Sequence, residues 1–392
     1  MKHADRWLLP DGIEEVLPPR AQHIENLRRH LLDVMNGWGY DLVMPPALEY
    51  IESLLSGAGQ DLDLRTFKVT DQLSGRLMGL SADTTPQVAR IDAHSLAPEG
   101  IGRFCYCRTV FHTRSRSLLA SRTPTQIGAE LYGQAGVEAD VEIICLMLET
   151  LSAAGLRDVH LDLGNVGVYQ AVAEHLALTD EQQQALFELL SLKCRSDVAL
   201  WARESQLGEN AQSIIDALMA LQGHPDALTD VATELARLVP ATADELDHLM
   251  SVTELVMNRY PETSVCLDVT ELRGYQYHTG LVFGAYVPGY GDAIAQGGRY
   301  DETGAAFGRA RPARGFSADL RVLEQLGEYS QPEIKTVVAP ADSKDDALWQ
   351  TVQSLRADGV RVVLGREADV QQADCSLQLM NDQWQLVNKK PV

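Results

Sequence analysis

Apolar side chains recur three and four residues apart in three stretches of the chain, which is the spacing of an amphipathic helix. Residues 20–37 and 139–155 each carry one such pattern, and each ends at a glycine, a common helix stop. Residues 167–257 are rich in alanine and leucine and keep the helical spacing throughout. Within them, Thr179 and Gln182 have the spacing of a capping box at the start of a helix. These stretches predict two separate helices and one all-helical region.

Short apolar runs predict β-strands on both sides of the helical region. Pro45 and Pro46 end one such run and allow only an edge or terminal strand, because proline cannot donate a backbone hydrogen bond. The glycine-rich residues 289–304 predict a turn, and a helix is expected over 317–329. The other runs expected to form strands are residues 65–71, 75–81, 102–111, 125–133, 158–165 and 263–288.

The last part of the chain, from about residue 334, alternates between strand-like and helix-like patterns on a smaller scale. It is long enough for one β-α-β unit followed by a hairpin. We therefore predict a core of mixed helix and sheet over residues 1–328, with the helical region at about 167–257 inserted in it. A short α/β domain is expected over 329–392.

Charge narrows the functions that this chain can have. Lysine and arginine number 33 against 55 aspartates and glutamates, which gives a net charge of −22. Nucleic-acid binding depends largely on basic side chains that displace counterions from phosphates, so we expect no nucleic-acid partner. No run reaches the roughly eighteen apolar residues of a membrane span, and the N-terminus is charged where a signal peptide is apolar. We therefore expect a cytoplasmic protein without a membrane partner.

The spacing of cysteine and histidine gives no sign of metal or redox chemistry. The six cysteines contain no CxxC pair, and the ten histidines contain no HxH or HxxxH, so we expect no metal site and no cofactor. Cys105 and Cys107 alternate as on one strand face and suit a redox pair, but buried thiols in a reducing compartment explain them better.

Positive charge gathers in residues 107–122 of this acidic chain, at Arg108, Arg114, Arg116 and Arg122. Such a cluster suits a phosphate or a nucleic acid, and solvated surface charge is the alternative. Two further stretches are ambiguous in the same way. Arg273, followed by aromatic positions, suits a carboxylate or phosphate clamp, although a hairpin with half-buried tyrosines has the same pattern.

Glycine and short polar side chains mark other possible pockets. Gly297 and Gly298 allow a ligand to approach the backbone, and a tight turn alone also explains them. Asp83 and Thr85 lie where side chains cap a helix, and the same groups can bind an ammonium group. By strand alternation Gln126, Gly128 and Glu130 share one face and suit a polar pocket.

Together, and in this order, these stretches resemble the catalytic core of class II aminoacyl-tRNA synthetases, and of histidyl-tRNA synthetase in particular. "YDLVMPPALEY" resembles the first class motif, in which a proline (Pro46 here) lies at the dimer interface. Residues 110–133 have the frame of the second motif, and "GFSADLRVL" resembles the third. "LRGYQYHTGLVF" and "AQGGRYDE" resemble two histidine-specific stretches. The resemblance covers about residues 8–165 and 258–325, and it implies an α+β fold with an antiparallel sheet flanked by helices.

The chain departs from that family where ATP is bound. The arginine and glutamate of the second motif fall on His112 and Arg114, and the Glu-Arg pair of the third motif falls on Arg321 and Val322. Amino-acid activation needs this charge around the phosphates, and removal of one such group typically slows a reaction about a hundred- to a thousandfold. The departures therefore imply that adenylation is lost and that no catalytic residue remains.

The amino-acid side of the family's pocket is better kept. The resemblance implies that Asp83, with Thr85 and Gln126, binds the ammonium group of histidine, that Glu130 reads the imidazole and that Arg273 binds the carboxylate or α-phosphate. A histidine replaces the second tyrosine of the family's pair. The implied histidine-binding set is Asp83, Thr85, Gln126, Glu130, Arg273, Tyr277 and His278.

The chain resembles the regulatory subunits of ATP phosphoribosyltransferase in three respects. It lacks the ATP-binding residues, its tail is too short for an anticodon-binding domain, and it contains the stretches "GFSADL" and "RGYQYHTG". That resemblance implies a non-catalytic subunit that forms a homodimer through its synthetase-like core. It also implies assembly with a short catalytic ATP phosphoribosyltransferase subunit into a hetero-octamer, activation of the first step of histidine biosynthesis, and feedback inhibition with histidine as effector. Arg114 and Arg116 then become candidates for contact with the partner.

Two other interpretations stay open. A divergent histidyl-tRNA synthetase-like adenylating enzyme is one, and His112, Arg114, Val322 and the short tail count against it. A stand-alone histidine-sensing module is the other. ATP–pyrophosphate exchange driven by histidine tests the first, and co-purification of a phosphoribosyltransferase tests the second.

Overall fold

The computed structural model describes residues 7–56, 60–115, 120–205, 207–208, 210–270, 278–330, 335–341, 344–366 and 373–388. The chain divides into two compact units, Met1–Tyr329 and Ser330–Val392. Among the helices in these ranges, none is both long and apolar enough to cross a bilayer.

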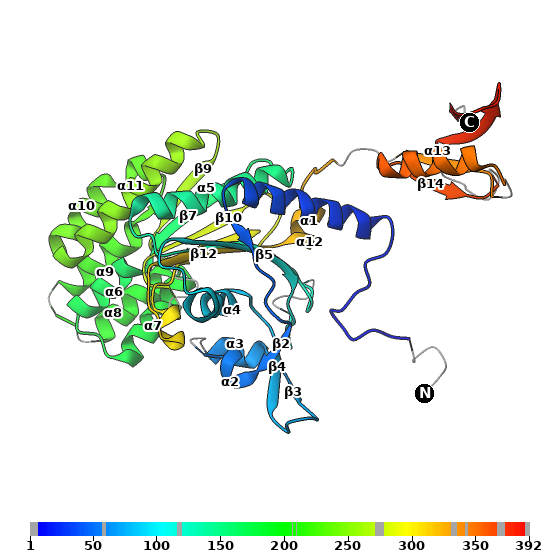
Figure 1. Ribbon diagram of the computed structural model, residues 1–392. Coiled ribbons are helices and arrows are strands. Elements are labelled where there is room, and N and C mark those ends of the chain that lie inside the picture. The colour runs from blue at the N-terminus through cyan, green and yellow to red at the C-terminus, as the bar shows by residue number, and fades with distance from the viewer. Residues whose placement is uncertain are drawn as a thin grey trace. The chain divides into compact units, whose positions relative to one another are not determined.

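A nine-stranded sheet forms the centre of the first unit (Figure 1). In spatial order its strands are β1 (Asp41–Leu42), β5 (Gly102–Thr109), β6 (Thr125–Tyr132), β12 (Ala313–Asp319), β11 (Ala295–Arg299), β10 (Leu281–Tyr286), β7 (His160–Asn165), β9 (Ser264–Asp268) and β8 (Gln222–Gly223). Neighbours are antiparallel except in the pairs β1–β5 and β7–β9. The short strand before the two prolines lies at the edge, as the sequence predicts.

Two long helices, α1 (Arg20–Gly37) and α5 (Val137–Ala153), cover one face of this sheet (Figure 1). Helix α1 buries Leu27 and Leu31, four residues apart on one side of the helix. Both helices pack against alternate residues of β6 in the main hydrophobic cluster. The sequence thus predicted both helices and the buried side of α1, whereas α5 is buried on nearly all sides. A shorter helix, α12 (Leu320–Leu326), follows β12 directly.

The opposite face of the sheet receives the polar residues of β6. Because the residues between them join the main core, Gln126, Gly128 and Glu130 point to this second face. Helix α4 (Thr85–Arg90) packs here, in a second hydrophobic cluster with aromatic side chains of β5 and β6. Neighbouring elements are the π-helix Ile91–Leu96, α2 (Ile51–Leu54), α3 (Gln60–Arg65), and a small sheet in the order β2 (Leu48–Tyr50), β4 (Leu77–Leu80), β3 (Phe67–Thr70).

The helical region is inserted between the parallel strands β7 and β9. Its helices are α6 (Val166–His175), α7 (Asp180–Ser191), α8 (Arg195–Glu204), α9 (Ala211–Ala220), α10 (Thr229–Leu238) and α11 (Ala243–Arg259), with short 3₁₀ turns at Pro225–Ala227 and Pro240–Thr242. The predicted capping box of Thr179 and Gln182 begins α7. The region is helical apart from β8, which pairs with β9 at the edge of the sheet.

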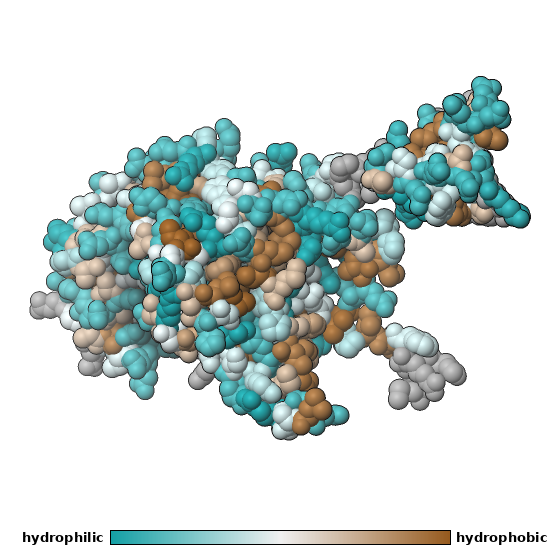
Figure 2. Space-filling view, viewed as in Figure 1, coloured by the Kyte–Doolittle hydropathy of each residue, from teal (hydrophilic) through white to brown (hydrophobic). Residues whose placement is uncertain are grey.

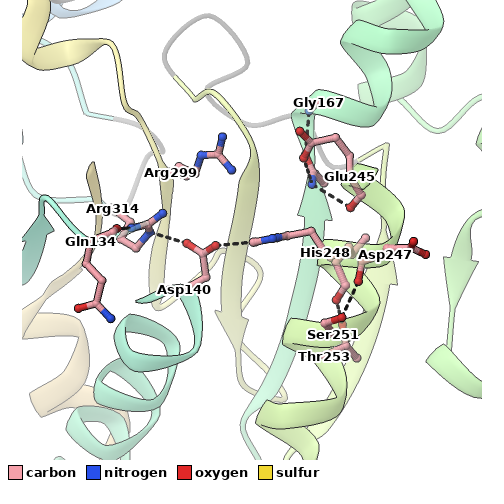
Figure 3. A network of polar contacts seen from close by, with 12 residues as sticks. Gln134, Asp140, Gly167, Glu245, Asp247, His248, Ser251, Thr253, Arg299 and Arg314 are labelled. Carbon is pink, nitrogen blue, oxygen red and sulfur yellow. Dashed lines mark hydrogen bonds and ion pairs between the residues drawn. The ribbon is translucent and has the colours of Figure 1, made fainter. Parts of the chain in front are cut away.

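Buried polar contacts fasten α11 to the sheet (Figure 3). The Nε2 atom of His248 lies 2.7 Å from Asp140 Oδ2, and Arg314 Nε donates to Asp140 Oδ1 over 2.6 Å. Nearby, Asn165 Nδ2 donates to Glu245 Oε2 over 2.8 Å. Asp140 and Arg314 are each only 1% exposed. These contacts join the insertion to α5, to β12 and to the end of β7.

The second unit is a small α/β fold. A parallel β-α-β unit consists of β13 (Thr336–Ala339), α13 (Asp346–Ala357) and β14 (Arg361–Leu364), and a hairpin consists of β15 (Cys375–Met380) and β16 (Gln383–Asn388). The sheet order is β14-β13-β15-β16. The sequence predicted this β-α-β unit and hairpin.

Two expectations from the sequence were wrong in part. The helix expected over 317–329 covers only Leu320–Leu326, because residues 317–319 end strand β12. Residues 289–304 are not simply a turn, because β11 forms inside them between β10 and β12. Gly297 and Gly298 serve the packing of this strand, whereas Gly289 lies in the turn before it. A side chain at Gly297 would collide with the ring of Phe283 and the carbonyl oxygen of Gly315, and one at Gly298 would collide with His278.

Candidate functional site

Glu130 lies on β6 and is only 1% exposed. Its Oε1 atom accepts hydrogen bonds from Thr85 Oγ1 (2.9 Å) and from the hydroxyl of Tyr106 (3.1 Å). Its Oε2 atom accepts a hydrogen bond from the hydroxyl of Tyr300. One carboxylate therefore connects α4, β5, β6 and the turn that follows β11.

Two glycines make room for this arrangement. Gly315 pairs with Glu130 across β12 and β6, and any side chain there would overlap the carboxylate. Gly128 pairs with Tyr106, and a side chain there would overlap the tyrosine ring and its hydroxyl. The small residue that the sequence placed beside Gln126 and Glu130 is thus required by close approach of the neighbouring strand.

Burial shifts the protonation of Glu130 and its neighbour Tyr106. It raises the pKa of the Glu130 carboxyl group well above its usual 4.5; hydrogen bonding from Thr85 opposes this, and the charge of Asp83 adds to it. Burial and the nearby Glu130 also raise the pKa of Tyr106. A protonated carboxyl group can donate a hydrogen bond to an imidazole nitrogen, whereas a carboxylate can only accept one.

Asp83 and Gln126 form the other half of the cluster. The amide Nε2 of Gln126 donates to Asp83 Oδ1 (3.0 Å), and its Oε1 accepts from the backbone N–H of Thr84 (2.9 Å). Asp83 Oδ1 also accepts from the backbone N–H of Thr85 (3.1 Å). Asp83 thus contacts the first residue of α4, but the N-cap residue is Thr84 and no side chain caps the helix as the sequence predicted; Asp83 is partly exposed. A carboxylate held in this way is also suited to an ammonium group.

The structure therefore brings Asp83, Thr85, Gln126 and Glu130 into one connected hydrogen-bond network. Arg273 and Tyr277, the other two predicted residues before His278, lie outside the described residues.

His278 lies next to this network. Its ring centroid is 6.4 Å from that of Tyr300, and its Nδ1 is 3.2 Å from the carbonyl oxygen of Arg299. Burial lowers the pKa of the His278 imidazole to about 4. The side chain is therefore neutral at physiological pH.

Two of the four arginines in residues 107–122 hold the chain together. Arg108 Nη1 donates to the carbonyl oxygens of Pro45 and Pro46 (3.0 Å each) and to Gln87 Oε1 (2.9 Å). Arg122 Nε donates to the carbonyl oxygen of His112 (3.1 Å). Both side chains serve as structural ties, a use that charge clustering in the sequence did not suggest.

The other two arginines are the candidate partner contacts. Arg114 is exposed, and Arg116 lies outside the described residues. His112, at the position of the family's phosphate-binding arginine, is 5% exposed, and its Nε2 lies 2.9 Å from Arg65 Nη2 and 3.0 Å from the carbonyl oxygen of Ala82. The imidazole is thus packed between α3 and the chain before α4.

Known proteins match the chain over its whole length. A protein from Ectopseudomonas mendocina (strain ymp) named ATP phosphoribosyltransferase regulatory subunit is 50% identical over 98% of this chain and 99% of its own length. Another of that name from Azotobacter vinelandii is 50% identical over 99% of each chain. This chain belongs to the family of ATP phosphoribosyltransferase regulatory subunits. Family models agree: one described as histidyl-tRNA synthetase matches residues 12–323, and one described as ATP phosphoribosyltransferase subunit HisZ C-terminal domain matches 334–387.

Solved structures confirm the predicted fold class. A protein from Bacillus halodurans, described as an ATP phosphoribosyltransferase regulatory subunit/histidyl-tRNA synthetase, is 26% identical with a TM-score of 0.81 and covers 94% of this chain and 95% of its own. Histidyl-tRNA synthetase from Nostoc sp. PCC 7120 has the same fold, with a TM-score of 0.77 at 21% identity over 95% of this chain and 91% of its own. The antiparallel sheet flanked by helices is that of class II synthetases.

The two third-motif positions have structural contacts in this regulatory-subunit fold. Arg321 Nη1 lies 3.1 Å from Glu14 Oε1, and Val322 packs against the main hydrophobic cluster. The structure also adds two hydroxyl groups that the sequence did not assign to the site, those of Tyr106 and Tyr300. Their signal was weak, because only the pairing of β5 with β6 and the path of β11 bring them to Glu130.

Proposed function

We propose that this chain is the non-catalytic regulatory subunit of an ATP phosphoribosyltransferase, and that it binds histidine in the pocket around Glu130. Membership in the family supports the first part. The connected network of Asp83, Thr85, Gln126 and Glu130, beside a second motif that carries His112, is the observation that supports the second. The pocket keeps groups that suit an amino acid and has lost groups that suit the phosphates of ATP.

The partner in this proposal is a short catalytic ATP phosphoribosyltransferase subunit, in a hetero-octamer that starts histidine biosynthesis in the cytoplasm. Histidine would then act as an allosteric feedback inhibitor by favouring one arrangement of the complex. Such coupling is typically worth about 1–3 kcal/mol, and it is reciprocal. Substrates of the catalytic subunit should therefore weaken histidine binding to the complex.

Exposed apolar side chains support a homodimer built through the first-motif region. Met44 is 75% exposed, Leu42 and Leu48 are 43% and 39% exposed, and Leu73 at the tip of the β3–β4 hairpin is 99% exposed. Figure 2 shows apolar side chains on this hairpin and on the adjoining part of the core. An uncovered patch of this kind commonly marks a protein–protein interface.

Calorimetry of histidine binding to the purified complex tests the pocket. Glu130→Gln should weaken binding at least about tenfold, since a buried polar group that loses its ligand partner typically costs about 1–3 kcal/mol. Glu138→Gln, an exposed glutamate on α5, is the matched control and should bind like the wild type. Equal affinities for Glu130→Gln and the wild type would remove Glu130 from the histidine site.

Activity of the complex tests the role as a regulatory subunit. The catalytic subunit should gain activity when this chain is added, and the chain alone should show no histidine-driven ATP–pyrophosphate exchange. Clear exchange would instead support the adenylating-enzyme interpretation. No association with a catalytic subunit would support a stand-alone histidine sensor.

Reversal of Arg114 and Arg116 to glutamate should weaken assembly or activation if these side chains contact the partner. Arg157→Glu, at an exposed position of the same unit, is the control.

A further inference from the structure

Three side chains of different metal-binding types converge on the paired strands β7 and β9. Within the described part of the chain, the ligand atoms of His160, Asp162 and Cys266 all lie within 4.8 Å of one another. Asp162 and Cys266 are direct neighbours across the parallel pair, and His160 is two residues before Asp162 on the same face. All three are partly exposed, so an ion can reach them from solvent.

The histidine is already oriented for coordination. Its Nδ1 lies 2.9 Å from Ser264 Oγ, and its Nε2 lies 3.0 Å from Asp162 Oδ1. Without a metal, the contact with Asp162 needs a proton on Nε2; a bound ion would replace that proton while Nδ1–H donates to the serine. Metal-binding histidines usually have their other nitrogen fixed in this way by a neighbouring polar group.

The surrounding charge also favours a cation. Asp268 follows on the same strand, is 1% exposed, and forms an ion pair with Lys193. Asp162 and Asp268 place two carboxylates near one lysine, which leaves an excess negative charge beside the Cys266 thiol. Without a metal, His160 pairs with Asp162 and Cys266 Sγ donates to the carbonyl oxygen of Leu267 over 3.5 Å; a bound ion would replace the protons of both groups.

We infer that His160, Asp162 and Cys266 form a binding site for a zinc-class divalent cation. Imidazole and thiolate ligands select zinc and similar ions over magnesium and calcium, which prefer oxygen ligands. Zinc bonds of about 2.0–2.3 Å place tetrahedral ligands roughly 3.5 Å apart, so a small rotation of the cysteine closes the site. Water completes the fourth position. This inference does not depend on the proposed histidine pocket.

Bound metal would join the two strands between which the helical region is inserted. The chain leaves β7 for α6 and returns from α11 to β9. The ion would therefore cross-link the two strands at the ends of the insertion. Closing a long loop in this way restricts the unfolded chain and stabilises the folded one. We therefore assign the site a structural role at the base of the insertion.

The test uses the purified full-length chain, reduced and freed of metal with a chelator. Zinc is titrated against a coloured chelator of known affinity, and one ion per chain is expected. Cobalt(II) substitution should give a thiolate-to-cobalt charge-transfer band in the near ultraviolet. His160→Gln and Cys266→Ser should each lose the stoichiometric site, and Ser264→Ala should weaken it roughly ten- to a hundredfold.

Matched controls separate this site from adventitious binding. His224→Gln removes an exposed histidine 3.6 Å from Asp226, and Cys194→Ser removes a partly exposed cysteine on the insertion. Both should bind zinc like the wild type. Circular dichroism verifies that each variant is folded. The inference is overturned if the wild type gives no saturable site, if its cobalt form lacks the thiolate band, or if folded ligand variants and controls bind alike.

Discussion

Glu130 carries a carboxylate that three hydroxyl groups satisfy, those of Thr85, Tyr106 and Tyr300. Each donor comes from a different element. The fold must therefore supply the hydrogen bonds that water would otherwise make to this side chain. A buried carboxylate that loses one donor cannot recover it from water. The stability of the pocket should therefore respond sharply to the loss of a single oxygen atom.

Tyr300→Phe removes one such oxygen and leaves the ring in place. We expect the free energy of unfolding to fall by about 1–3 kcal/mol, because Glu130 Oε2 stays buried without this donor. Urea denaturation measures the change. Tyr290→Phe, in the partly exposed turn between β10 and β11, is the control and should change stability by less than about 0.5 kcal/mol. Similar effects of the two variants would contradict this account of Glu130.

His278 should make stability depend on pH. Its pKa is lowered by burial from 6.5 to about 4, so the folded state keeps the ring neutral while the unfolded state protonates it. The contribution to stability is present above pH 6.5 and is lost as the pH falls toward 4, by at most about 3 kcal/mol.

The measurement is the free energy of unfolding of the wild type and of His278→Gln across this pH range. As the pH falls, the free energy of unfolding of the wild type should decrease relative to that of His278→Gln. His224→Gln, at an exposed histidine, should follow the wild type. A constant difference between the wild type and His278→Gln would show that burial does not shift this group.

Single residues of the site could be predicted only where local spacing determines them. Strand alternation placed Gln126 and Glu130 on one face, and the polar stretch before Pro86 gave the start of α4. Tyr106 and Tyr300 could not be assigned in this way, because their hydroxyls reach Glu130 through strand pairing. Arg108 and Arg122 show the converse, since side chains that looked like a phosphate clamp bind backbone carbonyls instead.

At the scale of elements, α11 is attached to the sheet through buried charges. Asp140 on α5 receives Arg314 from β12 and contacts His248 from α11 (Figure 3). Removal of one partner from a buried ion pair leaves the other charge buried and unpaired, which typically costs about 3–5 kcal/mol of stability. Although it has few contacts, this network should therefore make a large contribution to the free energy that holds the insertion on the sheet.

Arg314→Met tests that attachment. We expect a loss of about 3 kcal/mol or more in urea denaturation, and faster hydrogen exchange in α11. The control is Arg321→Met, since Arg321 pairs with Glu14, whose side chain is 52% exposed, and an exposed pair contributes about 1 kcal/mol or less. Equal losses in the two variants would mean that the Asp140 network does not hold the insertion.

Elements with a clear period were predicted well, and those defined by their neighbours were not. Helices α1 and α5 follow from apolar spacing, and so do the β-α-β unit and hairpin of the second unit. For strand β11 the sequence predicts a turn, because the strand is rich in glycine. Those glycines make room for Phe283 and β12, a requirement that produces no periodic pattern in the sequence. The His160, Asp162 and Cys266 cluster was missed for a similar reason, since pairing of β7 with β9 creates it.

At the scale of the whole molecule, exposed apolar side chains in a chain with a net charge of −22 need an explanation. Like charge keeps such molecules apart unless a specific interface offsets the repulsion. The first-motif region, with Met44 and Leu42, offers such an interface in the proposed homodimer.

Met44→Glu should therefore shift the chain from dimer toward monomer in sedimentation velocity, with the folded state preserved. The control is Leu192→Glu, since Leu192 is 74% exposed against 75% for Met44 but lies on the helical insertion. An unchanged dimer in Met44→Glu, or equal dissociation in both variants, would contradict an interface at the first motif.

The parallel pairing of β7 with β9 has a consequence for how this protein can vary. Parallel neighbours run in the same direction, so the chain between them must travel back along the strands, which takes a dozen residues or more. The whole insertion is in this sense one enlarged crossover. Helices can be lost, gained or exchanged within it while the register of the sheet is kept, but a tight turn cannot replace it. Length differences among relatives should therefore gather between α6 and α11, and this is where an engineer could graft a foreign helical module.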